Sequence, residues 1–194
     1  MKHVKAPPPE LARRLVGASE EVLRPGREMR LEDVAALVGS ARATLYYYFS
    51  GRDDLMAFLL QEHVAAASQA ISTAAHPGQP PGARLRSAVT ALIGFLGRQP
   101  GVCAGLLSFA GAAGQLRSVM AAKDDMLATP LQEILEEGAS TGQFSIGDAA
   151  DAANAILGAA MIATLARWDR GDDSAATAFQ QALTDQVIRG VLRG

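Results

Sequence analysis

Residues 31–49, LEDVAALVGSARATLYYYF, combine two short helical patterns with a glycine between them, and this segment restricts the fold more than any other part of the chain. The inward positions of the first pattern are Leu31, Val34, Ala35 and Val38, and those of the second are Leu45 and Phe49. Both sets have the spacing of one helix face. Gly39 tolerates the positive φ that a sharp corner requires. Two short helices joined in this way predict a helix-turn-helix unit.

The three tyrosines of the chain, residues 46–48, are adjacent on the second of these predicted helices, although aromatic residues make up only 5% of the sequence. Neighbouring side chains on a helix point about 100° apart, so the three rings cannot all face a core. A phenol packs its ring on a sugar or a thymine methyl group and donates its hydroxyl to a phosphate oxygen. With Leu45 and Phe49 inward, we predict contacts with DNA from Arg42, Ala43, Thr44, Tyr46, Tyr47, Tyr48 and Arg52. The alternative is that Arg42 and the tyrosines are ordinary solvent-exposed residues.

Helical periodicity extends through the rest of the chain without strand-like alternation, so the sequence predicts an all-α fold. One helix is expected from Glu10 to the Arg24-Pro25-Gly26 stop, and the last two helices are expected at Asp148–Trp168 and Ala175–Leu192. The segment HPGQPPG at 76–82 predicts a loop. The predicted organisation is a flexible arm at 1–9, a three-helix helix-turn-helix domain at 10–52, and a larger helical domain at 53–194.

Composition excludes several classes of protein. The single cysteine, Cys103, rules out an internal disulfide and a cysteine-based zinc site, and it fits a reducing cytoplasm. The uncharged stretches 99–116 and 152–166 are expected to be buried helices rather than membrane spans, and no membrane partner is expected. The formal net charge of −2 gives no indication of nucleic-acid binding.

The sequence also argues against an enzyme. It contains no HExxH, GxSxG, P-loop or GxGxxG motif, and its three histidines are scattered. The carboxylates of Glu133, Glu136 and Glu137 have no histidine nearby, so a solvated face is expected there rather than a metal site. We therefore predict no cofactor and no metal.

The segment LEDVAALVGSARATLYYYFSGRDDL resembles the DNA-binding region of the TetR family of bacterial transcriptional regulators. The resemblance runs through Gly39, Thr44-Leu45-Tyr46, Tyr48-Phe49, Arg52 and Leu55, and it covers roughly residues 10–60. It departs from the family at Arg30, where a capping Ser or Thr is usual, and Ser40 is an alternative cap for the following helix.

This resemblance implies a homodimer that binds a palindromic operator, usually as a repressor, and leaves it when a small molecule occupies the C-terminal domain. It also implies that the last two helices pair with those of a second copy. The residues expected at that interface recur every four positions and are Phe179, Leu183, Val187 and Val191.

For the ligand pocket we name Phe95, Cys103, Phe109, Met126 and Met161, and the charge-poor stretch 99–116 favours an apolar or aromatic ligand. A tightly packed core would have the same composition. An alternative function therefore stays open, in which the C-terminal domain only dimerises and binds no ligand. His63 is expected to be a surface or core histidine, and Cys103 a buried thiol rather than a redox sensor.

Overall fold

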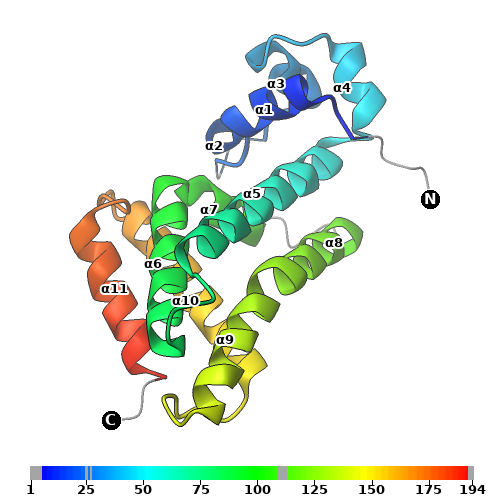
Figure 1. Cartoon of the computed structure of the whole chain (residues 1–194). Coiled ribbons are helices and arrows are strands. Elements are labelled where there is room, and N and C mark those ends of the chain that lie inside the picture. Colours follow the sequence, from blue (N-terminus) through cyan, green and yellow to red (C-terminus); the bar gives the residue numbers. More distant parts are fainter. Residues whose placement is uncertain (1–5, 25, 27, 109–112, 192–194) are drawn as a thin grey trace.

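The computed structural model describes residues 6–24, 26, 28–108 and 113–191, and the elements in this part of the chain are helices without β-strands. The N-terminal domain contains α1 (Pro9–Gly17), α2 (Ser19–Val22), α3 (Leu31–Leu37) and α4 (Arg42–Tyr48). The long helix α5 (Arg52–Ala74) leads from it into the C-terminal domain. There follow α6 (Pro81–Arg98), α7 (Pro100–Ser108), α8 (Ala113–Lys123), the π-helical turn η2 (Asp124–Ala128), α9 (Thr129–Ser140), α10 (Ala149–Asp169) and α11 (Thr177–Arg189). Figure 1 shows the N-terminal domain at one end of α5 and the helical bundle around its other half.

The single helix expected from Glu10 to residue 24 is two helices. They meet at Ala18, whose φ of −94° and ψ of 0° leave the regular helical geometry. The change of direction lets Leu11 and Leu15 pack into the N-terminal domain while Leu23 packs against the C-terminal domain. Apolar spacing alone did not reveal this break, because both segments keep a helical period.

The expected arm at 1–9 is shorter in the structure. Residues 1–5 lie outside the described residues, Pro7 is buried, and Pro9 already begins α1. Proline suits that first helical position because its missing N–H has no partner there in any case.

The helix-turn-helix corner has the geometry that the sequence predicts. Gly39 has a φ of +62°, the N–H of Ser40 donates to the carbonyl of Ala35 at 2.8 Å, and the N–H of Gly39 donates to that of Ala36 at 3.2 Å. This pair of bonds is a Schellman motif, which ends a helix with a left-handed residue. Arg14 of α1 holds the corner from outside, because its guanidinium donates to the carbonyls of Val38 at 2.8 Å and Gly39 at 3.0 Å.

Helix α5 belongs to both domains. Its first turns contribute Leu55 and Leu59 to the apolar core of the N-terminal domain. In the same turns, the next positions Met56 and Leu60 join Leu23, the residue after α2, in a small cluster at the junction of the two domains. The expected boundary after Arg52 therefore falls at the start of a helix that both cores share. A rigid helix of this kind transmits a tilt from one domain to the other.

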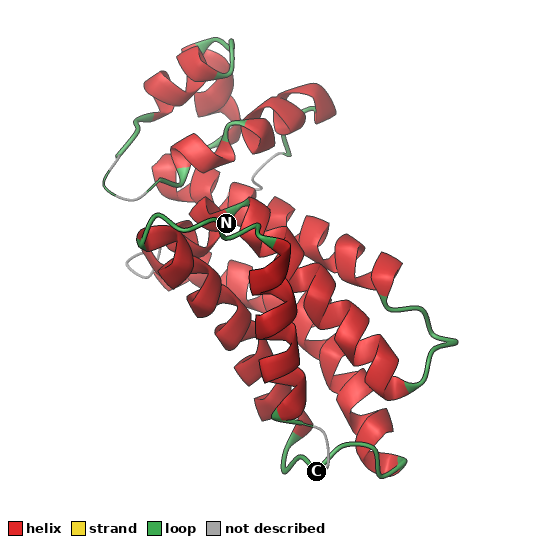
Figure 2. Ribbon diagram, turned by 90° about the vertical axis from the view of Figure 1, so that its left-hand side faces the viewer, coloured by secondary structure: helices red, strands yellow, loops and turns green. Residues whose placement is uncertain are grey.

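The C-terminal domain packs α6 at its centre. Leu85, Val89, Leu92 and Ile93 of α6 are buried among side chains from α5, α9, α10 and α11. Figure 2 shows these helices running side by side below the N-terminal domain. The loop expected at 76–82 connects α5 to α6, although Pro81 and Gly82 already belong to α6.

Helix α10 is less buried than the sequence indicated. It packs against α6, α7 and α9, but only 28% of its most apolar window is buried. By length and composition α10 meets the criterion for a membrane span, which core helices of soluble proteins also meet. Its exposed positions are mostly small or apolar and include Ala155, Ala159, Ile162 and Ala166.

Candidate nucleic-acid interface and ligand pocket

The outward face of α4 carries most of the predicted DNA-contacting residues. Leu45 and Phe49 are buried in the N-terminal core. Arg42 and Ala43 are exposed, Thr44 is half-buried, and the side chains of Tyr46 and Tyr47 are 45% and 62% exposed. A helix held inward at two positions thus presents its other face to solvent, which is the arrangement that a major groove accepts.

Tyr48 differs from its two neighbours because it is half-buried and packs against the N-terminal core. Position 48 lies three residues after Leu45 and one before Phe49, so it borders the buried face of the helix. The edge of one ring meets the face of the other where Tyr47 and Tyr48 pack, with 4.9 Å between centroids. Tyr48 therefore supports Tyr47 from the core side.

Glu32 of α3 links Arg42 and Tyr46. Its Oε1 atom accepts a hydrogen bond from the Tyr46 hydroxyl at 3.0 Å. The same atom forms an ion pair with the Arg42 guanidinium at 2.8 Å. The Arg42 guanidinium also lies over the Tyr46 ring, 5.3 Å from its centroid. Hydrogen bonding from its own backbone amide, then from Tyr46, and the charge of Arg42 lower the pKa of Glu32. A carboxylate thus occupies the donors that a DNA phosphate would use.

Arg52, the last predicted contact, begins α5. It borders a surface hollow together with Arg30, Glu32 and Tyr46, and its buried Nε has no hydrogen-bond partner among the described residues. The hollow lies between the starts of α3 and α5 and the end of α4. Ser40 does not cap α4, because Ala41 occupies the N-cap position without a side-chain hydrogen bond.

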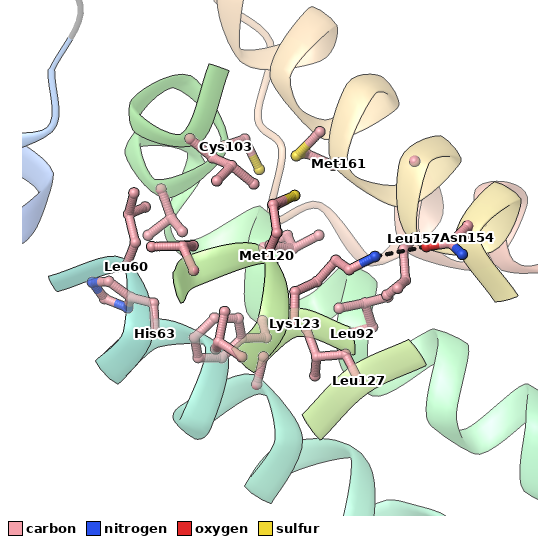
Figure 3. Close-up of a pocket in the computed structure, with 18 residues that line it drawn as sticks. Leu60, His63, Leu92, Cys103, Met120, Lys123, Leu127, Asn154, Leu157 and Met161 are labelled. Carbon is pink, nitrogen blue, oxygen red and sulfur yellow. Dashed lines mark hydrogen bonds between the residues drawn. The ribbon is translucent and has the colours of Figure 1, made fainter. Parts of the chain in front are cut away.

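The C-terminal domain contains an apolar cavity of about 240 Å³ between α5, α6, α7, α8 and α10 (Figure 3). Its walls are mainly aliphatic and aromatic side chains and two methionines. Residues along it include Leu60, Leu92, Phe95, Met120, Leu127 and Leu157. A concave, largely apolar site with few polar groups is typical of a small-molecule pocket.

Three of the five predicted pocket residues line this cavity, namely Phe95, Cys103 and Met161. Met126 does not line it and is 36% exposed, because its neighbour Leu127 takes the inward position in η2. Phe109 lies outside the described residues. The apolar composition of these helices indicated their burial but not which residue of each helix faces the cavity.

Three polar residues that line the pocket, His63, Lys123 and Asn154, were not predicted there. His63 is 3% exposed, and burial lowers its pKa to about 4, so its ring is neutral at neutral pH. Lys123, at the end of α8, is the one charged side chain among the lining residues that the structure describes. Lys123 lies directly before the π-helical turn η2. That turn could not be predicted from the sequence, so nothing in the sequence marked Lys123 as a pocket residue.

Cys103 lines the cavity as a neutral thiol. Burial, followed by the nearby charge of Glu20, raises its pKa to about 12. Since the thiolate is the reactive form of cysteine, this environment disfavours a redox sensor at this position.

Three contacts connect the pocket region to the N-terminal domain through α2. His63 Nε2 hydrogen-bonds with Ser19 Oγ at 2.8 Å, and both side chains are buried. Glu20 accepts a hydrogen bond from the N–H of Gly101 at 3.2 Å, and burial raises its pKa. Leu23 packs so closely on Gly105 that a Cβ there would lie 2.9 Å from a Leu23 methyl group.

Of the four residues predicted at the dimer interface, one is buried in the chain's own core and three are half-buried. Val191 is only 7% exposed, and Leu183 and Val187 pack against the main core. Phe179 is half-buried beneath the Arg167 guanidinium, 4.7 Å from its ring centroid. The buried positions of α11 are Thr184 and Ile188, so the predicted row borders the face that meets α6 and keeps partly exposed side chains. Its place at a dimer interface stays a prediction. Among the described residues, no three His, Cys, Asp or Glu side chains are grouped so that they could hold a metal ion.

Comparison with known proteins finds a matching family model and solved structures with a similar fold. Residues 78–191 match the model of the tetracyclin repressor-like C-terminal domain. FadR, the fatty acid degradation regulator of Bacillus halodurans, is 20% identical and superposes with a TM-score of 0.79, over 96% of this chain and 98% of that one. FadR of Bacillus subtilis, solved in complex with stearoyl-CoA, is 16% identical with a TM-score of 0.74, over 92% and 98%. The ketosteroid regulator KstR2 of Mycobacterium tuberculosis is 14% identical with a TM-score of 0.65, over 98% of each chain. No protein with a curated description matches the sequence.

The matched model covers more than half of the chain, so this protein belongs to the TetR family of transcriptional regulators. The family combines an N-terminal helix-turn-helix DNA-binding domain with a C-terminal helical domain, and its members are regulators rather than enzymes. The structural neighbours are under 25% identical and support the fold alone.

Proposed function

We propose that this chain is a transcriptional repressor that binds a palindromic operator as a homodimer and is released from it by a small molecule. The observation that carries the proposal is the connection between its two sites. Helix α5 contributes Leu55 and Leu59 to the core beneath α4, and it contributes Leu60 and His63 to the wall of the pocket. The regulator is expected to act in the cytoplasm.

The DNA-reading role rests on the exposed face of α4. Arg42 is suited to a base edge, since a guanidinium can donate two hydrogen bonds to guanine, and the Tyr46 hydroxyl is suited to a phosphate. Both groups reach DNA only when Glu32 releases them. The exchange of one anionic partner for another makes the event sensitive to salt.

The dimer rests on the exposed side of α10. One short recognition helix reads only a few base pairs, and a second copy about 34 Å away reaches the next major groove on the same side of the duplex. The apolar positions Ala155, Ala159 and Ile162 on that side have no cover in one chain, and Leu107 of α7 is exposed beside them. An isologous contact of this face with its copy would bury these residues.

The ligand response rests on the pocket and on α2. A ligand changes DNA affinity only if it binds one of two conformations better than the other. Here the imidazole of His63 lines the cavity on one side and holds Ser19 of α2 through its Nε2. A ligand that moves this ring changes the contact of α2 with α5, and with it the position of the N-terminal domain. The apolar walls of the cavity support an apolar ligand.

Selection of bound sequences from random DNA with the purified protein tests the proposal. The expected result is a palindrome whose half-sites lie about one helical turn apart. Enrichment of a single half-site, or no enrichment, would argue against a dimeric repressor. A panel of apolar metabolites then separates the ligand-responsive repressor from a regulator whose C-terminal domain only dimerises, for which no compound would shift DNA affinity.

A further inference from the structure

The pocket has a single source of charge. Among the lining residues that the structure describes, Lys123 alone carries a formal charge, and the remaining polar groups are His63, Cys103 and Asn154. His63 is neutral at neutral pH, and Cys103 is a protonated thiol. An apolar cavity with one cation favours a ligand whose own charge is negative and confined to one end.

Lys123 is held in place toward the cavity's α10 side. Its Nζ donates to Asn154 Oδ1 at 2.6 Å and forms an ion pair with Asp124 (Figure 3 shows the bond to Asn154). Asn154 is itself fixed, because its Nδ2 donates to the carbonyl of Ala150 at 3.0 Å. An ammonium group has three donors, so one hydrogen remains after these two partners.

Of the two anchors, Asp124 is the one that a ligand displaces. The Lys123 side chain is 20% exposed, whereas that of Asp124 is 59% exposed. The Asp124 carboxylate is largely hydrated even in this pair, so a carboxylate arriving from the cavity replaces it more readily than it replaces Asn154. Asn154 then keeps the ammonium group oriented. The η2 turn begins at Asp124, and π-helical turns of this kind are frequent at functional sites.

The size of the cavity limits the apolar part. A cavity of about 150 Å³ holds one benzene molecule, so 240 Å³ corresponds to a ligand of about ten non-hydrogen atoms. An unbranched chain or a single ring with a short tail fits this volume, and a stearoyl chain does not fit without enlarging it.

We propose that the pocket binds a compact amphiphilic monoanion of about ten non-hydrogen atoms in all, whose carboxylate is bound by Lys123. The ligand's apolar part lies among Leu60, Phe95 and Leu157, and Asn154 positions the ammonium group. This inference names the ligand class of the proposed regulator. Ligand binding can be tested without DNA, and only the regulatory role of the ligand rests on the proposed function.

Calorimetric titration with three probes that share one alkyl chain tests the inference: octanoate, octan-1-ol and octylamine. Octanoate is expected to bind at least about tenfold more tightly than octan-1-ol, and octylamine most weakly, because only the carboxylate compensates Lys123. Octan-1-ol binding as tightly as octanoate, or no binding of octanoate at all, would overturn it. Binding of octanoyl-CoA without binding of octanoate would overturn it too, since a thioester carries no charge at Lys123.

Lys123→Met keeps an aliphatic side chain of similar length and removes the charge. It is expected to weaken octanoate binding about tenfold and to leave octan-1-ol unchanged, so the preference for the anion disappears. Arg84→Met is the matched control. Arg84 is also a largely buried cation, 17% exposed and paired with Glu137, but it does not line the cavity, so this variant should bind octanoate like the unmodified chain. Unchanged octanoate binding by a folded Lys123→Met variant would refute the role of Lys123.

Operator binding without any ligand is measured separately in a gel-shift assay. Octanoate binding without any effect on the operator complex would leave the ligand class in place and disprove the ligand response. Operator binding by a protein that has no affinity for octanoate would disprove the ligand class and leave the DNA-binding function in place.

Discussion

The DNA-reading face and the ligand pocket use charge in opposite ways. On the face, Arg42, Tyr46 and Glu32 lie together on exposed surface and satisfy one another. In the pocket, Lys123 is the one charged side chain among the lining residues that the structure describes, and burial keeps His63 neutral. Solvent screens the first group, so its partners exchange readily, whereas each polar atom of the second requires a specific partner. In the proposed function, this difference would let the face exchange one anion for another and let the pocket select its ligand.

The largest expected effect concerns the buried histidine. The pKa of His63 is about 4 in the folded chain and 6.5 when unfolded, so the unfolded state binds a proton first as the pH falls. Stability from this residue is complete above pH 6.5, declines between pH 6.5 and about 4, and loses roughly 3 kcal/mol by the lower end. Denaturant titrations across this range measure the loss. His63→Gln retains a hydrogen-bonding side chain without titrating, and its stability should depend less on pH. Equal pH dependence of both proteins would contradict the assignment, since carboxylates such as Glu20 are common to the two.

The next effect is on operator recognition. Arg42→Ala is expected to weaken operator binding by about 1–3 kcal/mol and to relax preference at one base pair in each half-site. Tyr46→Phe is the comparison, because it removes only a hydroxyl and should weaken binding to all sequences about equally. Fluorescence anisotropy on the selected operator and on single-base variants measures both. If Tyr46→Phe changed the base preference and Arg42→Ala did not, the two roles would be exchanged.

An effect of similar size, on local stability rather than on DNA binding, is expected at the junction that joins the two regions. Ser19→Ala leaves the His63 Nε2 without its partner and should destabilise α2 by about 1–3 kcal/mol. Hydrogen exchange of the α2 amides should then accelerate, while that of α9 stays unchanged. Ser140→Ala is a suitable control, because that exposed hydroxyl bonds only to the carbonyl of Glu137 in its own helix. Unchanged exchange in Ser19→Ala would show that Leu23 and Glu20 hold the junction alone.

The smallest effect concerns the carboxylate that competes with DNA. Glu32→Gln removes a negative charge next to Arg42 and Tyr46, and operator affinity should rise a few-fold at low salt. Glu136→Gln, which removes an exposed carboxylate far along the chain in α9, should leave affinity nearly unchanged. Reduced affinity in Glu32→Gln would mean that Glu32 serves to orient Arg42 for its base rather than to compete with phosphate.

The comparison also explains which features could be predicted. The turn of the helix-turn-helix depends on contacts between near neighbours, such as the bond from Ser40 to Ala35, so its signal lies within a few residues of sequence. The outward direction of Arg42 and Tyr46 could be predicted for the same reason, because it follows from their spacing relative to Leu45 and Phe49. Tyr48 was harder to place because it borders the buried face. The corner geometry at Gly39 agreed with the sequence for the same local reason.

The pocket depends on contacts between helices that are distant in the sequence. Five helices meet there, and whether Met126 or Leu127 faces inward is decided by the π-helical turn and by the packing of α8 and η2 on α5. Likewise, apolar residues recur every four positions on α11, but only the packing of α11 on α6 determines that Thr184 and Ile188 are its buried positions.

The sequence by itself determined the helical class, the helix-turn-helix and the outward face of its second helix, because short-range periodicity and one positive-φ glycine are local properties. Only the tertiary structure decided that α2 connects to the pocket through Ser19 and His63, and that Lys123 is the charge within it. Burial and partners create the character of these groups, and both arise only when segments far apart in the chain pack together.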